Sequence, residues 1–441
     1  MANKVIPIGK LFNLEKGQLQ STKCTPGEYD FITAAEDWKT HNGYNHECEA
    51  LIFAAAASGS LGRTHYVDGK FISSDLCFIL TPKNKEKYPL NLAFYNFVFN
   101  SLRPVIVAAT KSGTSKESIN QTNLKKYELP YFDIEQQDLW IEKLKNTQVR
   151  KELLASELTH QQTLLKKLRQ QILQEAIEGK LTADWRQQNH DVEPASELLA
   201  RIQEEKAKLI KERKIKKQNP LSPIREEEKP FALPEGWEWC RLGQTTYGFQ
   251  YGTSSKSSES GEVPVLRMGN LQKGKIDWDD LVFSSDQEDI AKFDLHIGDL
   301  LFNRTNSREL VGKTAIFDGL QKAIYAGYLV RFRMAGGTIS EYVNMVMNSA
   351  LHRNWCDEVK TDALGQSNIN ATKLSLFRFP LPSIDEQKAI VSKVEKLLNF
   401  CDQIEAQITQ NQTHAEQLMQ AVLQEAFSHS SAQQNQEAVN A

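Results

Sequence analysis

Long apolar runs and paired cysteines are missing from this sequence of 441 residues. No run approaches the roughly 18 apolar residues of a membrane-spanning helix, and the opening segment MANKVIPIGK has no apolar stretch of the kind found in signal peptides. The six cysteines stand far apart without a C-x-x-C pair, which is typical of free thiols in a reducing compartment. We therefore expect a cytoplasmic protein with neither a disulfide framework nor a zinc site.

Recognisable catalytic motifs are missing too. The sequence contains no N-P-P-Y or D-P-P-Y motif for adenine methylation and no nuclease cluster of carboxylates with a paired lysine. The segment Ser307–Thr314 ends like a phosphate-binding loop, but Ser307 occupies a position that needs glycine, and a predicted strand follows instead of a helix. His41 and His46 do not have the H-E-x-x-H spacing of zinc enzymes. We expect no metal site and no catalysis by this chain alone.

The chain also lacks a strong charge of either sign, with a net charge of −3. This balance gives no global indication of a polyanionic partner, although a local basic face would be enough to bind one. The length exceeds that of one ordinary domain, so two domains with connecting segments are expected.

What the sequence does contain is an internal repeat. The segment INQTNLKKYELPYFDIEQQ (Ile119–Gln137) returns 250 positions later as INATKLSLFRFPLPSIDEQ (Ile369–Gln387). The same offset relates Leu61–Gly69 to Val311–Gly319 and Leu168–Ala176 to Leu418–Ala426, whereas Pro7–Leu11 resembles Arg241–Thr245 at an offset of 234. The chain therefore has the layout A–B–A′–B′, with insertions near the domain starts.

Each A part mixes predicted strands and helices. Apolar or β-branched runs bounded by Gly, Ser and Asn predict strands at Asp75–Leu80, Arg103–Thr110 and Tyr328–Met334. Helices are predicted at corresponding places, over Asn91–Leu102 and Glu341–Trp355. The predicted class of A and A′ is therefore α+β.

Each B part carries a heptad seam, with apolar residues alternating at spacings of four and three. Gln161 and Asn411 occupy equivalent seam positions and could form a buried amide pair that sets the register. Helices of about 45 residues would be roughly 65 Å long. The residues predicted to pair the two helices are Leu144, Leu154, Leu158, Gln161, Leu165, Leu168, Ile172, Val394, Leu397, Ile404, Ile408, Asn411, Leu418 and Val422.

These patterns divide the chain into six segments. The predicted boundaries are a first α+β domain at 1–133, a long helix at 134–182, a charged helix with a Pro-rich linker at 183–232, a second α+β domain at 233–383, a second long helix at 384–428 and a polar tail at 429–441. The basic end of the linker helix, Lys206–Lys217, is either a solvated face or a contact to DNA or a partner.

Three motifs resemble a known family. LPEGWEWCRLGQ (Leu233–Gln244), the segment Gly365–Leu398 and QQILQEAIEGKLT (Gln171–Thr182) are similar to the specificity subunit of type I restriction–modification enzymes. The resemblance covers nearly the whole chain in the right order. The first domain departs from the pattern because it has no LPEGW segment and starts directly at VIPIGKL, which leaves its boundaries less defined.

The resemblance implies a non-catalytic, sequence-specific DNA-recognition subunit. Two α+β target-recognition domains in a pseudo-twofold arrangement would each read one half of a bipartite site, separated by the two long helices as an antiparallel coiled coil. Two methylation subunits would dock on these helices to form an adenine-N6 methyltransferase. S-adenosylmethionine would bind in those partners and no cofactor in this chain. Added restriction (translocase–nuclease) subunits would make an endonuclease, and no membrane is implied.

The predicted spacer has a suitable length for this arrangement. Half-sites that are read from the major groove lie multiples of a 34–36 Å turn apart, so a rod of roughly 65 Å can hold two readers one to two turns apart. Because a single chain can carry two different domains, it can read two unrelated half-sites with a fixed gap.

Candidate DNA contacts lie in loops rich in small, amide and cationic residues. Such residues allow the backbone to approach phosphates, and Arg, Asn and Gln can make paired hydrogen bonds to base edges. The alternative is that these are ordinary solvated loops in which Gly62 and Gly312 form turns. The candidates are Arg63, Lys111, Gly113, Thr114 and Lys116 in the first domain, and Asn303, Arg304, Asn306, Arg308, Lys313, Gln366, Ser367 and Asn368 in the second.

Two other functions stay open on the sequence alone. One is a tandem-domain scaffold that binds proteins and has no DNA specificity, with the helix seam serving only intrachain packing. The other is a self-sufficient methyltransferase or nuclease, against which the missing motifs argue.

Overall fold

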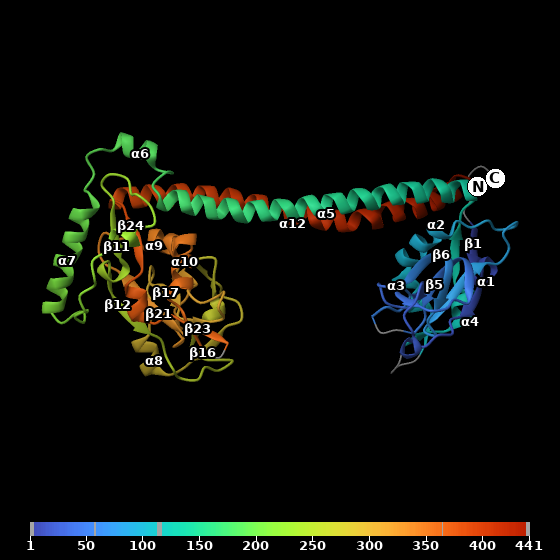
Figure 1. Ribbon diagram of the computed structural model, residues 1–441, viewed down its shortest axis with the longest axis horizontal. Coiled ribbons are helices and arrows are strands. Elements are labelled where there is room, and N and C mark those ends of the chain that lie inside the picture. The colour runs from blue at the N-terminus through green and yellow to red at the C-terminus, as the bar shows by residue number, and fades with distance from the viewer. Residues whose placement is uncertain (1–3, 57–58, 113–116, 364, 438–441) are drawn as a thin grey trace. The chain divides into compact units, whose positions relative to one another are not determined.

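The computed structural model describes residues 4–56, 59–112, 117–363 and 365–437 (Figure 1). The chain divides into two compact units. Unit 1 comprises Met1–His160 and Ile408–Ala441, and unit 2 comprises Gln161–Gln407. Unit 1 combines two segments that are distant in the sequence, whereas unit 2 is one continuous segment, and each long helix is divided between the two units.

Unit 1 is organised around a six-stranded sheet with the order β2-β7-β5-β6-β3-β4. Neighbouring strands are antiparallel except for β3 and β6, which are parallel. The apolar run of β5 is buried along its second half, which fits its position between two other strands. The strands are β2 (Phe12–Lys16), β3 (Tyr29–Ile32), β4 (Lys39–His41), β5 (His46–Ala54), β6 (Thr64–Ser73) and β7 (Cys77–Pro82).

Short helices and strand pairs complete unit 1. The rings of Phe12, Phe53, Tyr95 and Phe99 meet edge to face in its core, between the sheet and α2. The elements are β1 (Lys4–Pro7), α1 (Ile8–Leu11), η1 (Ser21–Lys23), α2 (Leu92–Ser101), α3 (Arg103–Thr110), β8 (Lys111–Ser112), β9 (Ser118–Ile119), α4 (Gln121–Lys126) and β10 (Glu128–Tyr131).

The segment Arg103–Thr110 forms helix α3, so the prediction of a strand there is wrong. Its β-branched residues suggested a strand, but Pro104 lies in the first turn of the helix, where its fixed φ and missing N–H are tolerated. Ile106 and Thr110, four residues apart, are buried on one face of the helix. Tertiary packing overrides the weak β propensity of this run.

Unit 2 contains several small sheets in place of one large one. Their orders are β12-β21-β17-β19, β16-β13-β20 and β18-β23-β22, with β14-β15 and β11-β24 as separate pairs. The strands are β11 (Glu238–Arg241), β12 (Thr246–Tyr251), β13 (Val263–Leu266), β14 (Leu271–Gln272), β15 (Lys275–Ile276), β16 (Val282–Ser284), β17 (Leu300–Asn303), β18 (Thr305–Asn306), β19 (Thr314–Ile316), β20 (Ile324–Tyr325), β21 (Leu329–Met334), β22 (Thr361–Ala363), β23 (Gln366–Asn368) and β24 (Arg378–Leu381).

The helices of unit 2 include those of the linker. Within the linker, Lys206 of α7 donates hydrogen bonds to the carbonyls of Gly243 and Gln244 in η3. These bonds attach the linker to the rest of unit 2. The helices are α6 (Ala183–Gln188), α7 (Ala195–Lys211), η2 (Glu226–Glu228), η3 (Leu242–Gln244), η4 (Met268–Asn270), α8 (Gln287–Lys292), α9 (Ser340–Val346), α10 (Ala350–Val359) and α11 (Ala371–Ser375).

Equivalent residues of the two sequence repeats make equivalent side-chain contacts. Gln137 and Gln387, 250 positions apart, are both fully buried. The Gln137 amide nitrogen donates to the carbonyls of Pro89 and Phe132, and its oxygen accepts from the backbone N–H of Asn91. Gln387 makes the corresponding three hydrogen bonds to Gly337, Pro382 and Ile339.

The entry strands of the two units are also equivalent. In unit 1, β1 pairs antiparallel with β10, and Ile6 lies opposite Leu129. In unit 2, β11 pairs antiparallel with β24, and Cys240 lies opposite Phe379. The first partners differ by 234 positions and the second by 250, as in the sequence repeat. The two units are therefore variants of one folding plan.

Two long helices, α5 (Ile134–Ile177) and α12 (Ile384–Glu437), contribute to both units. Helix α5 ends five residues before the expected limit at 182, and α12 continues through much of the segment expected to be a polar tail. In unit 2 the helices run antiparallel, because Arg169 contacts Asp402 and Glu405, whereas Leu181, farther along the chain, accepts from Lys393. In unit 1, Val422 packs in the same core as Ile141 and Leu144.

Only one series of the predicted heptad seam is buried. Leu144, Leu158, Leu165, Ile172, Val394, Ile408 and Val422 are buried, and their spacing is seven or a multiple of seven. The prediction that the other series is also buried is wrong, because Leu154, Leu168, Ile404 and Leu418 are 39%, 45%, 47% and 37% exposed. Leu397 and Asn411 are half-buried, and Gln161 is exposed. A regular two-stranded coiled coil buries both series, so these two helices depart from that packing.

No single helix among the described residues is long and apolar enough to cross a membrane. Helices α2 and α3 would satisfy the criterion only if they were counted together, and they are bent by 71° at the break between them.

Candidate nucleic-acid interface

The two candidate loops of unit 2 are brought together by a small sheet. Strand β18 pairs with β23 so that Thr305 lies opposite Asn368 and Asn306 lies opposite Ser367. The Asn368 amide nitrogen donates to the Thr305 hydroxyl at 2.7 Å. Segments that are more than 60 residues apart in the sequence therefore form one continuous surface element, as a composite binding site requires.

Arg304 is held in place at this surface. Its guanidinium lies 4.8 Å from the centre of the Tyr251 ring, and its Nε donates to the Gly327 carbonyl at 3.0 Å. The Tyr251 hydroxyl in turn accepts from the backbone N–H of Ala371 at 3.0 Å. These contacts fix the plane of the guanidinium while they use only its Nε–H, so the paired terminal N–H groups are oriented for an acceptor.

Arg304 also lines a cavity of about 410 Å³ together with Arg267, Tyr328 and several serine hydroxyls. A terminal nitrogen of Arg267 donates to the Asp280 carbonyl at 2.6 Å, whereas its buried Nε has no hydrogen-bond partner. A cavity with two arginines, hydroxyls and an exposed tyrosine at its edge can accept an anionic or acceptor-rich ligand such as a phosphate or a base edge.

The other candidates of unit 2 differ in their accessibility. Arg308 is exposed, with Asp362 4.0 Å away, and Gln366 is exposed on β23. Asn306 is half-buried and accepts from the Ser307 backbone N–H, while Lys313 donates to Gln272 at 2.9 Å. These four side chains lie at the surface, where a duplex could reach them.

Two candidates do not lie where a DNA contact needs them. Asn303 is fully buried at the end of β17, and neither polar atom of its side chain has a hydrogen-bond partner. Ser367 is 1% exposed, and its hydroxyl donates to Asp362. Alternation along the strand turns both side chains inward. We therefore correct the predicted set by removing Asn303 and Ser367 from the direct contacts.

The candidates of unit 1 are engaged within the protein or fall outside the described residues. Arg63 donates to the Ala34 carbonyl at 3.4 Å and lies 3.6 Å from Glu36, and Lys111 forms an ion pair with Glu117 at 2.9 Å. Both pairs include exposed carboxylates, so they are weak enough to exchange for a phosphate. Gly113, Thr114 and Lys116 lie outside the residues that the structure describes.

Sequence reasoning missed Tyr251, Arg267 and Tyr328. They lie on segments far from the loop 303–313 in the chain and contact Arg304 or line its cavity only after folding. No local motif marks them. The one available signal was the aromatic–Gly–Thr–Ser–Ser stretch that begins at Tyr251, which is typical of an exposed turn.

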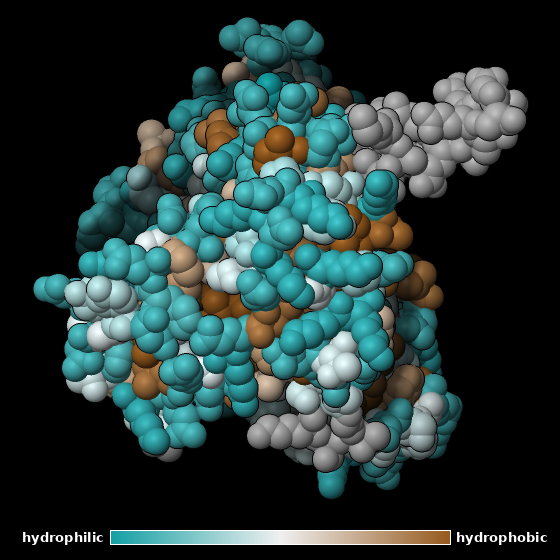
Figure 2. Space-filling model, turned by 90° about the vertical axis from the view of Figure 1, so that its right-hand side faces the viewer, coloured by the Kyte–Doolittle hydropathy of each residue, from teal (hydrophilic) through white to brown (hydrophobic). Residues whose placement is uncertain are grey.

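The face of unit 1 shown in Figure 2 is mainly hydrophilic. Hydrophobic residues appear there as small, separate patches among polar and charged ones. Large contiguous apolar patches mark protein-docking surfaces, and none is in view among the described residues of this face.

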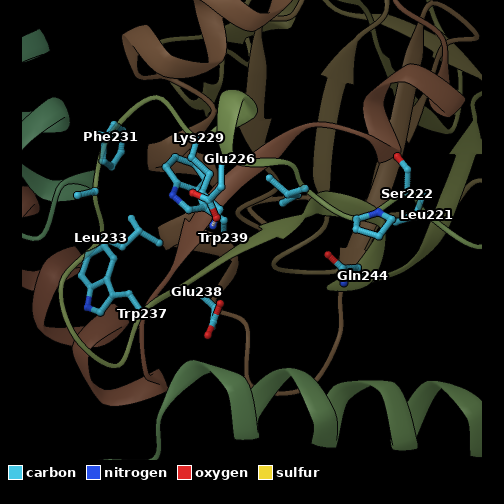
Figure 3. Close-up of a pocket in the computed structure, with 13 residues that line it drawn as sticks. Leu221, Ser222, Glu226, Lys229, Phe231, Leu233, Trp237, Glu238, Trp239 and Gln244 are labelled. Carbon is cyan, nitrogen blue, oxygen red and sulfur yellow. Dashed lines mark hydrogen bonds and ion pairs between the residues drawn. The ribbon is translucent and has the colours of Figure 1, made fainter.

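A cavity of about 800 Å³ lies where the linker covers β11. Figure 3 shows the side chains of Glu226, Lys229 and Trp239 close together on one side of it. The rings of Phe231 and Trp239 are 5.0 Å apart, and the indole N–H of Trp239 is buried without a partner. Glu226 and Glu238 line the cavity with Lys229 as the sole cation, so its charge does not favour an anion.

The described residues offer no group of three or more His, Cys, Asp or Glu side chains that could hold a metal ion. The buried thiols are not activated either, since burial raises the pKa of Cys77 and of Cys356 to about 12. The features that are present are repeated α+β units, a fixed surface arginine and a pair of long helices. They define the class of two-unit α+β proteins with a pair of long helices.

Comparison with known proteins identifies the family. The family described as "Type I restriction modification DNA specificity domain" matches residues 2–159 and 234–412, one segment in each copy of the repeat. The chain belongs to this family of type I restriction–modification specificity subunits.

Individual relatives agree with the family match. The chain is 36% identical over 251 residues to the EcoAI specificity subunit of Escherichia coli, which covers 54% of this chain and 40% of that protein. It is 31% identical to the EcoEI specificity subunit of the same species, covering 58% and 45%. The chain thus spans less than half the length of these two relatives. The E. coli EcoDI subunit is 24% identical over 96% of this chain and 87% of its own length.

Solved structures share the fold. A chain from a study of complex assembly and conformational transition in the type I R-M system aligns with a TM-score of 0.66, at 15% identity and 97% coverage of both chains. The HsdS subunit from Thermoanaerobacter tengcongensis aligns with a TM-score of 0.56, at 14% identity and 96% coverage of both. The predicted α+β class with two long helices is confirmed.

Proposed function

We propose that this chain is the cytoplasmic DNA-recognition subunit of a type I restriction–modification complex and that it reads a bipartite site, one half with each unit. The observation that carries the proposal is that the family match falls once on each copy of the repeat. Each copy retains the same buried glutamine network, which supports a common role, while their sheets and surface loops differ. Different loops on one folding plan are what reading two unlike half-sites requires.

In unit 2 we propose Arg304 as the central base contact, with Arg308, Gln366, Asn306 and Lys313 around it. A guanidinium fixed by an aromatic ring and a carbonyl can donate two parallel hydrogen bonds to one guanine, which is the commonest specific contact in the major groove. Exposed cations nearby would bind phosphates and set the register of the duplex. In unit 1, Arg63, Lys111 and the candidates Gly113, Thr114 and Lys116 would serve the other half-site.

The methylation subunits would dock on α5 and α12. The unpaired series of the seam leaves Leu154, Leu168, Ile404 and Leu418 exposed on these helices, and Phe400 is 62% exposed as well. Exposed apolar side chains in a row on a long helix fit a helix from a partner. The chain itself would be non-catalytic, S-adenosylmethionine would bind in the two methylation subunits, and restriction subunits would join through the complex.

The proposal is tested by measuring how the assembled complex binds a DNA duplex that contains the sequence it methylates. The affinity should fall steeply as salt rises, with a slope of log K against log salt that reports the number of phosphate contacts. Arg304→Ala should weaken binding by about 1 to 3 kcal/mol and relax base preference in one half-site only. A salt-independent affinity would indicate a protein-binding scaffold instead, and equal losses at both half-sites would contradict separate readers.

A further inference from the structure

A third cavity lies between the basic end of the linker and strands β12 and β21 of unit 2. Its volume is about 860 Å³. Linker residues 209–221 form one wall, and parts of β12, β21 and α11 form the other. It shares no residue with the cavity at Arg304, and none of the candidate DNA contacts lines it.

The charge of this cavity is positive. Lys214, Lys216, Arg331 and Arg333 line it, and no aspartate or glutamate does. Buried Asp299 lies behind the two arginines, 2.6 Å from Arg333 and 3.5 Å from Arg331. It compensates one of their two charges.

The carboxylates at the margin do not reverse this balance. Glu212 pairs with Lys214 at 2.9 Å. Glu205 accepts from the Tyr247 hydroxyl, and the amine of Lys206, which donates to the lining residue Gln218, brings a cation to the same margin. Lys216 and one arginine therefore remain as uncompensated cations at the cavity.

Two buried donors at the cavity have no acceptor. The Nε of Arg331 and the side-chain nitrogen of Gln218 are both buried and without a hydrogen-bond partner. Gln218 cannot turn its amide around without loss, because its oxygen accepts from Lys206 at 3.1 Å. Buried polar groups are nearly always paired in folded proteins, so unpaired donors beside uncompensated cations indicate that an acceptor-rich anion completes the site.

The remaining wall is apolar and aromatic. Phe249, Leu209 and Leu376 line the cavity together with the ring of Tyr247. An apolar wall beside cations suits a ligand that has a phosphate group attached to a less polar body, and the volume is within the range of small-molecule sites.

We propose that this cavity binds a phosphoryl group through Arg331, Gln218 and Lys216. The phosphoryl group could belong to a free nucleotide or to the backbone of bound DNA. The inference does not rest on half-site reading, because it concerns a different cavity and a different set of residues.

The test uses isothermal titration calorimetry on the full chain in its complex, with inorganic phosphate, ATP and a DNA duplex as three separate probes. Lys216→Glu reverses an exposed charge at the cavity, and Lys217→Glu is the matched control, because Lys217 is exposed but does not line the cavity. Gln218→Glu replaces the unpaired donor by an acceptor and keeps an oxygen for Lys206.

We expect at least one probe to bind about tenfold more weakly to both Lys216→Glu and Gln218→Glu than to Lys217→Glu. An effect with ATP or phosphate identifies a free ligand, and an effect confined to the duplex identifies a DNA phosphate. If all three probes bind the cavity variants and the control equally, the proposal is overturned. If the unsubstituted complex binds phosphate or ATP but shows no sequence-specific DNA binding, that result contradicts the proposed function and leaves this site intact.

Discussion

At the scale of single residues, Glu386 joins three segments of unit 2 through one buried carboxylate. It is 2% exposed, and it accepts from the Thr182 hydroxyl at 2.7 Å and from the Trp237 indole N–H at 2.8 Å. Arg186 forms an ion pair with it. Glu386 thus fixes three segments together: the segment that follows α5, the start of the second α+β domain and the first turn of α12. A buried carboxylate is stable only when its partners are all present.

Glu386→Gln should therefore destabilise unit 2 by about 2 to 4 kcal/mol, because it leaves Arg186 without its counter-charge. Asp385→Asn is the matched control: Asp385 is exposed and pairs with Lys388, so the loss of its charge should cost less than about 1 kcal/mol. Thermal unfolding of the two variants decides the matter, and equal stability would contradict a role for Glu386 as a junction.

His352 gives a pH dependence with a definite sign. It is fully enclosed by the rings of Phe302, Trp355 and Phe377. Burial, with a smaller contribution from Arg353, lowers the pKa of His352 from 6.5 to about 3. Between these values the unfolded chain binds a proton that the folded chain does not, so stability should fall as pH falls from about 6.5 towards 3.

His352→Phe keeps an aromatic ring and removes the titrating group. We expect the loss of unfolding free energy between pH 7 and pH 4.5 to be smaller in this variant by about 1 to 3 kcal/mol. Chemical denaturation at the two pH values measures the difference, whatever the variant's stability at pH 7. An unchanged difference would show that His352 takes no part in the acid sensitivity.

At the scale of elements, the long helices were predicted better in extent than in packing. Helices α5 and α12 begin at Ile134 and Ile384, the first residues of the predicted helices. Which of the two heptad series is more buried depends on how each helix is rotated toward its partner, and the repeat alone does not state that rotation. The same limit explains the segment Arg103–Thr110, whose local propensity was outweighed by packing.

The two series should respond differently to the same substitution. Leu165 is 7% exposed and Leu168 is 45% exposed, and they lie three residues apart on α5. Leu165→Ala should lower the free energy of unfolding by about 2 to 4 kcal/mol, as buried leucines do, whereas Leu168→Ala should change it by less than about 1 kcal/mol. Thermal unfolding of the chain without methylation subunits compares them. Equal losses would mean that both series pack within the chain.

At the scale of the whole molecule, the proposed spacer role predicts a change in the gap between half-sites. Seven residues inserted in α5 just before Arg169, with seven inserted in α12 just after Glu405, lengthen both antiparallel helices on the same side of their ion pair. A heptad preserves the seam and adds about 10 Å, or about three base pairs.

Sequencing of methylated adenines in a host that carries the variant measures the new gap. The half-site letters should stay the same while the gap grows. Methylation at the original gap would reject the spacer role. An insertion in α5 alone is the control, because it breaks the register between the helices and should reduce methylation without a defined new gap.

The sequence by itself determined the repeat, the α+β class, the long helices and the family, because each depends on local pattern or on identity at matched positions. Only the tertiary structure decided which residues share a surface. It placed Tyr251 against Arg304, turned Asn303 and Ser367 inward, and left two buried donors facing a cationic cavity. Side-chain direction follows from strand pairing and from how helices pack, and both depend on residues far away in the chain.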